Sequence, residues 1–98
     1  MGTGFGIEFD LIHNHHEKAV LYAVKTHASA HPQLPEELLA DIACVALNRL
    51  PPRYIRHDVD FAFFLSDKER AETQDAIDEA VGFAFEFVRA RAAVRARA

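Results

Sequence analysis

Two consecutive prolines, Pro51 and Pro52, set the firmest limit on how this chain of 98 residues folds. Neither proline can continue a helix, so an apolar helical pattern that begins near Pro35 must end at Leu50. The residues that follow this helical spacing are Leu38, Leu39, Ile42, Ala43, Val45, Ala46 and Leu50. The pattern predicts a helix from Pro35 to Leu50, with two glutamates in its first turn at the positive end of its dipole.

Capping signals place one further helix on each side of this segment. Asn14 with Glu17 three residues later has the form of a capping box, which predicts a first helix from about Asn14 to about His27. Ser66 with Glu69 forms the clearest capping box in the chain. A third helix is therefore expected to start there and to run past residue 88.

The third predicted helix is apolar on two sides. Its main stripe has helical spacing and comprises Ile77, Val81, Phe85 and Val88. Phe83 and Phe87 extend the apolar surface around the helix. A chain this short also buries a smaller fraction of its surface than a larger domain does. Both features predict a homodimer with this helix in the interface.

Residues 54–65 show a different period. Apolar side chains recur at every second position, at Val59, Phe61, Phe63 and Leu65, which is typical of a strand with one buried face. A short irregular helix fits nearly as well, so the choice between strand and helix for residues 58–65 stays open. The predicted fold class is mainly α: residues 1–98 form one small helical bundle with at most one short strand, a flexible arm over 1–10 and a basic tail over 90–98.

The charge balance is uneven along the chain. Four arginines in the last ten residues leave 7 basic against 15 acidic side chains, a net charge of -8, in residues 1–88. Such an acidic body argues against binding to a nucleic-acid backbone, which needs a broad basic face. No apolar stretch reaches the roughly 18 to 20 residues that span a bilayer, and no basic segment followed by an apolar core opens the chain. We expect a cytoplasmic protein without membrane contact.

One window of the chain is electropositive. Residues 42–57 contain no acidic side chain and hold Arg49, Arg53, Arg56 and His57 around the two prolines. Guanidinium groups match phosphate oxygens and the O6/N7 edge of guanine, and the ring of Tyr54 offers a face on which a base can stack. This window predicts a site for a ligand that carries phosphate and purine. Ordinary capping of a helix end by arginine would explain the same residues without a ligand.

Other chemistry finds little support in the sequence. No glycine-rich phosphate loop is present, and Cys44 lies among apolar neighbours, where a thiol is a poor nucleophile. We therefore expect neither enzymatic activity nor a cofactor. His13, His16 and Glu17 would share one face if the first helix began early, which raises a metal site as an alternative. No cysteine pair or His-Glu-x-x-His pattern accompanies them, so no metal is assigned.

The segment from Asp41 to Tyr54 resembles the signature of the late competence development ComFB family. In that family a helix of the form Asp-aliphatic-x-x-x-Ala-Leu-Asn-x-Leu leads into Pro-Pro-x-Tyr, and a segment similar to His13-Asn14-x-x-Glu17 starts the first helix. The resemblance covers most of the chain, from about residue 11 to about residue 88, and its central motif is specific.

The resemblance implies a small helical dimer, and several family members are receptors for cyclic di-GMP or cyclic di-AMP with links to motility, cell size or competence. The residues that match and become site candidates are Asn48, Arg49, Arg53 and Tyr54, to which the charge argument adds Arg56 and His57. Some members hold zinc through cysteines just before the central helix. This chain has no cysteine there, so zinc is not carried over.

The leading hypothesis is a non-enzymatic cyclic dinucleotide receptor in bacterial signalling. Cyclic di-GMP is favoured because arginine forks suit the guanine edge, and a two-fold ligand suits a two-fold dimer. The first alternative is an adaptor that docks a partner protein without nucleotide, and the second is a metal-stabilised domain. The sequence names no downstream partner.

Overall fold

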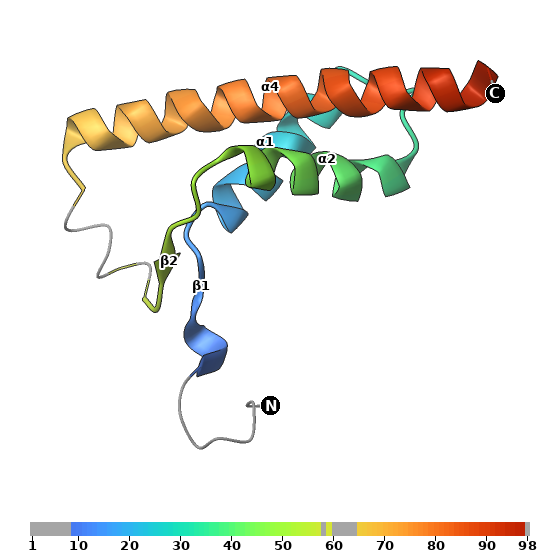
Figure 1. Ribbon diagram of the computed structural model, residues 1–98. Coiled ribbons are helices and arrows are strands. Elements are labelled where there is room, and N and C mark those ends of the chain that lie inside the picture. The colour runs from blue at the N-terminus through green and yellow to red at the C-terminus, as the bar shows by residue number, and fades with distance from the viewer. Residues whose placement is uncertain (1–8, 58, 60–64, 98) are drawn as a thin grey trace.

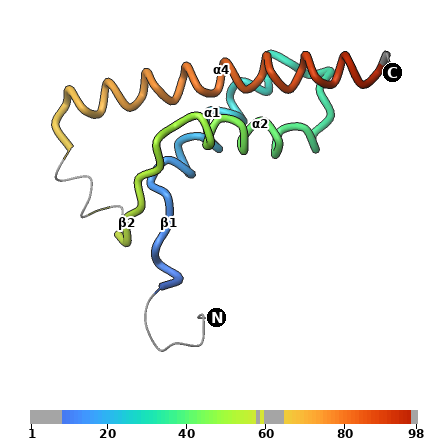
Figure 2. Tube along the Cα trace, in the orientation of Figure 1, coloured from blue at the N-terminus to red at the C-terminus, as the bar shows by residue number. Residues whose placement is uncertain are grey.

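The computed structural model describes residues 9–57, 59 and 65–97, and its architecture is mainly α-helical, as the sequence predicts. The described helices are η1 (Phe9–Leu11), α1 (Glu17–Ala28), α2 (Glu36–Arg49) and α4 (Asp67–Arg97). Figure 1 shows α4 as the long upper helix, with α2 running antiparallel beneath it. In the tube of Figure 2, η1 and the last turn of α4 lie far apart.

The core lies where α1, α2 and α4 meet. Its buried side chains are Val20, Ala23, Val24, Ile42, Ala43, Ala46, Leu50, Ile77, Ala80, Val81, Ala84, Phe85 and Val88. Ala46, Ala80 and Ala84 are 0% exposed, and such short side chains let helix axes approach closely. The predicted main stripe of the third helix is confirmed, because all four of its residues are buried.

The predicted limits of the second and third helices are confirmed, and local chemistry explains them. Leu50, the residue before the two prolines, has an extended backbone (φ -95°, ψ 138°), because a following proline disfavours the helical region. At the start of α4 the hydroxyl of Ser66 accepts a hydrogen bond from the Glu69 amide at 3.1 Å. The Ser66 amide donates to Glu69 Oε1 at 3.2 Å, which completes the capping box.

The first helix starts later than the sequence predicts. Its first residue is Glu17, and the residue before it, His16, makes no side-chain capping hydrogen bond. Asn14 lies in a strand instead, where its Oδ1 accepts hydrogen bonds from the amides of His16 at 3.2 Å and Arg53 at 3.1 Å. The spacing assigned the Asn14 side chain to a helix cap, but its oxygen binds the backbone amide of Arg53, 39 residues away.

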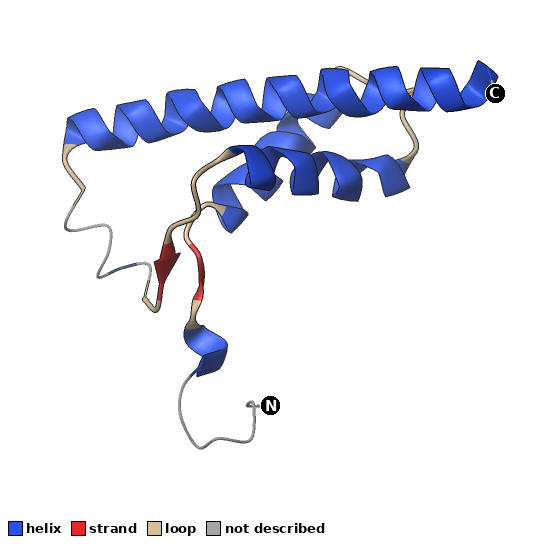
Figure 3. Ribbon diagram, in the orientation of Figure 1, coloured by secondary structure: helices blue, strands red, loops and turns tan. Residues whose placement is uncertain are grey.

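Two short strands form an arm beside the helices. β1 (His13–Asn14) pairs antiparallel with β2 (Tyr54–Ile55), with Asn14 opposite Tyr54. Figure 3 shows both strands projecting away from α4. The sequence predicted at most one short strand, whereas the structure has two, because Tyr54–Ile55 pairs with a distant segment that local spacing assigned to a helix. Of the predicted alternation, Val59 is 70% exposed and so does not lie on a buried face. Phe61 and Phe63 belong to residues 58 and 60–64, which lie outside the described residues.

Cys44 is exposed, although its sequence neighbours predicted an apolar environment. One residue along a helix turns a side chain by about 100°, so Ala43 faces the core while Cys44 faces solvent. In the described part of the chain, no helix combines the length and the apolar character needed to cross a membrane.

Candidate functional site

Arg49, in the last turn of α2, is bound to α4. Its Nη2 donates to Glu79 Oε1 at 2.8 Å, and its Nε lies 3.3 Å from both carboxylate oxygens. Its guanidinium carbon also lies 3.9 Å from the centre of the Phe83 ring. The hydrogen bond with Glu79 raises the pKa of Arg49 and lowers the pKa of Glu79. Arg49 therefore holds the end of α2 against α4, while its neighbour Asn48 is exposed.

Arg53 follows the two prolines and has a firmly held backbone. Its amide donates to Asn14 Oδ1 at 3.1 Å, and its carbonyl accepts from the His15 amide at 2.6 Å. Tyr54 continues into β2, where its side chain is 67% exposed. The prolines, the two backbone hydrogen bonds and the strand pairing together limit how far the base of the Arg53 side chain can move.

The remaining two candidates lie farther along the arm. Arg56 and His57 follow β2 directly, both are exposed, and Arg56 Nε donates to His57 Nε2 at 3.1 Å. The six predicted residues therefore divide into two groups. Asn48 and Arg49 end α2, with Arg49 facing α4, and the other four follow the arm away from it (Figure 1).

A cleft of about 330 Å³ adjoins the Pro-Pro turn. Pro51, Pro52 and Arg53 line one side, and His15 and His16 also border it. Glu69 and Glu72 of α4 line it as well, so the cleft presents both positive and negative groups. Of the six predicted site residues, Arg53 is the one that lines this cleft.

His16 was predicted to be a surface residue, and the structure places it at this cleft. Burial and the neighbouring His15 lower the pKa of His16, a hydrogen bond with the Pro51 carbonyl acts in the opposite direction, and Arg53 adds to the lowering. Its Nδ1 is buried and makes no hydrogen bond to any described residue. Asn14 and His16 were missed as site-forming residues, although the ability of an asparagine to bind backbone amides nearby was a usable signal for Asn14.

The histidines are not gathered as a metal site would require. Because α1 begins at Glu17, His13 and His16 precede the helix and do not share a helical face with Glu17. His13 Nδ1 lies 2.7 Å from the Leu11 carbonyl oxygen. Farther along, the rings of His27 and His31 stack on Phe85 at 5.7 Å and 5.0 Å. Within residues 9–57, 59 and 65–97, no three His, Cys, Asp or Glu side chains lie close enough to hold a metal ion.

Residues 13–92 match the family model of the late competence development protein ComFB. The chain belongs to the ComFB family. The match contains all six predicted site residues and most of α4. No curated protein and no solved structure was found to match.

The ComFB motif of this chain spans α2, the Pro-Pro turn and the start of β2. Its apolar positions Ile42, Ala46 and Leu50 are buried in the core. Its polar positions Asp41 and Asn48 are exposed. The apolar part of the motif is therefore explained by packing, whereas the exposed polar part has no role in the core.

Proposed function

We propose that this ComFB protein is a non-enzymatic receptor for a cyclic dinucleotide in the bacterial cytoplasm, with cyclic di-GMP favoured over cyclic di-AMP. The motility, cell-size and competence pathways associated with the family are the processes it would serve. The proposal assigns the ligand contacts to the Pro-Pro turn and to the residues beside it.

The observation that carries the proposal is the anchoring of Arg53 at the edge of the 330 Å³ cleft. Both polar groups of its backbone are held, at 3.1 Å and 2.6 Å, so little backbone conformational entropy is lost when its side chain binds. A guanidinium fork matches two phosphate oxygens. The proline rings beside it and the exposed ring of Tyr54 add the apolar surface that a nucleotide needs.

The receptor is proposed to act as a homodimer through α4. Phe83, Phe87 and Val94 of this helix are 39%, 40% and 63% exposed and follow one another at helical spacing, so they form one apolar face of the kind that marks interaction sites. A two-fold ligand would then meet the same set of arginines from each subunit.

Calorimetric titration with cyclic di-GMP and with cyclic di-AMP, each at low and high salt, tests the proposal. GTP and ATP serve as controls for general phosphate binding. We expect saturable binding of about one cyclic dinucleotide per dimer. Arg53→Ala is expected to weaken it at least tenfold with an unchanged melting temperature, because a charge-assisted fork to phosphate is lost.

Arg89→Ala is the matched control, because Arg89 is an exposed arginine of α4 that is paired with Glu86 at 2.6 Å. This variant should bind as the wild-type protein does. Full affinity in Arg53→Ala would overturn the site assignment. Absence of binding to all four nucleotides would overturn the receptor function and favour the adaptor alternative.

A further inference from the structure

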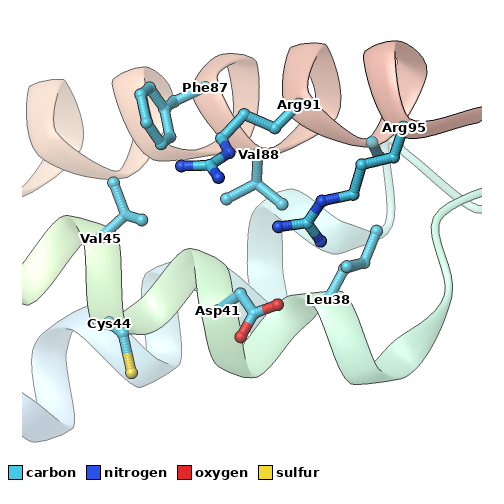
Figure 4. Close-up of a pocket in the computed structure, with 9 residues that line it drawn as sticks. Leu38, Asp41, Cys44, Val45, Phe87, Val88, Arg91 and Arg95 are labelled. Atoms are coloured by element: carbon cyan, nitrogen blue, oxygen red, sulfur yellow. The ribbon is translucent and has the colours of Figure 1, made fainter. Parts of the chain in front are cut away.

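A second cleft, of about 290 Å³, opens between α2 and the C-terminal half of α4. Leu38, Val45 and Val88 supply its apolar lining. Figure 4 shows the side chains of Arg91 and Arg95 reaching from α4 toward α2, where Asp41 stands. Three charged groups thus surround an apolar floor.

Helix packing does not account for this arrangement. Arg91 and Arg95 are one turn apart, where two like charges repel each other and destabilise a helix. Asp41 supplies a single opposite charge, so the three groups keep a net charge of +1. All three are exposed and none belongs to the buried core. The cleft therefore presents charges of both signs to solvent beside its apolar lining.

Stacked groups connect this cleft with Arg49. The guanidinium of Arg49 covers Phe83 at 3.9 Å, and the Phe83 and Phe87 rings stack with centres 5.8 Å apart and planes 23° apart. The guanidinium carbon of Arg91 lies 5.7 Å from the centre of the Phe87 ring. Arg49, Phe83, Phe87 and Arg91 therefore form one continuous row of flat groups that runs from the end of α2 to the second cleft.

The charges of the cleft restrict the ligand further. A simple anion would be attracted by the two arginines but repelled by Asp41. A flat ring that carries donors on one edge and acceptors on another satisfies both kinds of group. Guanine has N1–H and N2–H donors for a carboxylate, and O6 and N7 acceptors for a guanidinium. Adenine has an acceptor at N1, which would face the carboxylate unfavourably.

We propose that Asp41, Arg91 and Arg95 form a base-recognition pocket that selects guanine over adenine. The carboxylate of Asp41 accepts hydrogen bonds from the guanine N1–H and N2–H groups, and the arginines bind O6, N7 or the adjoining phosphate. The inference rests on the proposed receptor function and names the part of the molecule that decides which cyclic dinucleotide binds.

The test compares the dissociation constants of cyclic di-GMP and cyclic di-AMP for the wild-type protein, Asp41→Asn, Arg91→Ala and the control Arg89→Ala. We expect the wild-type protein to prefer cyclic di-GMP. Asp41→Asn should weaken cyclic di-GMP at least about fivefold and leave cyclic di-AMP unchanged or tighter, since one bidentate contact to a base is lost. Arg91→Ala should weaken cyclic di-GMP by a similar factor, and Arg89→Ala should change neither constant.

The outcomes separate this inference from the function on which it rests. If the wild-type protein binds neither cyclic dinucleotide, the receptor function itself is overturned. If it binds cyclic di-GMP while Asp41→Asn and Arg91→Ala keep its affinity and preference, the base pocket is overturned and the receptor stands. A wild-type preference for cyclic di-AMP would also overturn the pocket. Circular dichroism of each variant shows that a loss of binding is not a loss of fold.

Discussion

Asn14 shows how one amide side chain can position a candidate site. It is 8% exposed, and its oxygen accepts hydrogen bonds from backbone amides on both sides of the arm, at His16 and at Arg53. The first bond shapes the entry into α1, and the second fixes the backbone that follows the Pro-Pro turn. Without this oxygen, two amides near the cleft would lose their acceptor.

Asn14→Ala is expected to lower the free energy of unfolding by about 1–3 kcal/mol, the usual cost of leaving partly buried polar groups without partners. Urea denaturation followed by circular dichroism measures the change. Asn48→Ala is the control, because Asn48 is exposed on α2, and its effect should stay within about 0.5 kcal/mol. Equal effects of the two substitutions would contradict the anchoring role of Asn14.

His16 should make the fold sensitive to acid. Burial beside His15 places the pKa of His16 below its ordinary value of about 6.5, so the unfolded chain binds this proton more readily than the folded chain does. At higher pH His16 therefore does not lower the free energy of unfolding. As the pH falls from about 6.5 toward the lower pKa of the folded state, His16 lowers the free energy of unfolding progressively.

Unfolding free energies of the wild-type protein and of His16→Gln at about pH 7.5 and about pH 5.5 test this expectation. The wild-type protein should lose more stability than the variant on acidification, because glutamine cannot bind a proton. Parallel losses in the two proteins would assign the acid sensitivity to other groups.

At the scale of elements, α4 contributes to the core and to both clefts. Its first turn carries the Ser66–Glu69 capping box, its middle binds Arg49 through Glu79, and its last turns line the second cleft. Gly82 stands near the centre of these 31 residues. Apart from its chain neighbours and the adjacent backbone of α4, a Cβ atom at Gly82 would meet no atom within 4 Å.

Gly82→Ala is therefore expected to raise the free energy of unfolding by about 0.5–1 kcal/mol, because alanine restricts the unfolded chain and fits the helix without a clash. Ala90→Gly, at an exposed position of the same helix, should have the opposite effect of similar size. Thermal or urea unfolding measures both. A destabilised Gly82→Ala protein would mean that another surface, such as a second copy, approaches this glycine.

The whole molecule is elongated. Its radius of gyration is 16.0 Å, whereas a compact domain of about 100 residues has a value of about 13 Å. Figure 1 shows the causes, since both ends of α4 extend beyond α2 and the strand arm projects to the side. A long helix with exposed apolar side chains leaves surface that a second copy of the chain would cover.

Val94→Glu should convert the proposed dimer into a monomer of 11.0 kDa, since a charge on the exposed apolar face of α4 would be desolvated on association. Light scattering coupled to size-exclusion chromatography gives the mass. Leu21→Glu, at a 50% exposed position of α1, should remain a dimer of twice that mass. Dissociation by Leu21→Glu alone would place the interface on α1 instead.

Local signals in the sequence were sufficient for α2, for the start of α4 and for the core stripes. Pro51 ends α2 because its ring disfavours the helical conformation of the preceding residue, Leu50. Ser66 and Glu69 cap α4 within one turn. The apolar spacing identified Ile42, Ala43, Ala46 and Leu50 of α2 and the main stripe of α4 as buried, because helical periodicity is a property of neighbouring residues. Leu38, Leu39 and Val45 of the same α2 pattern are only partly buried. The family motif followed from the same local segment.

Contacts between distant residues were not predictable in this way. Asn14 bonds Arg53, 39 residues away, and Arg49 bonds Glu79, 30 residues away. Asp41 lines the same cleft as Arg91 and Arg95 because α2 and α4 pack side by side. Sequence spacing decides which face of its own helix a side chain occupies, whereas its partner depends on how separate elements pack. The helices of this protein are therefore determined by neighbouring residues in the sequence, whereas its clefts arise from the packing of those helices against one another.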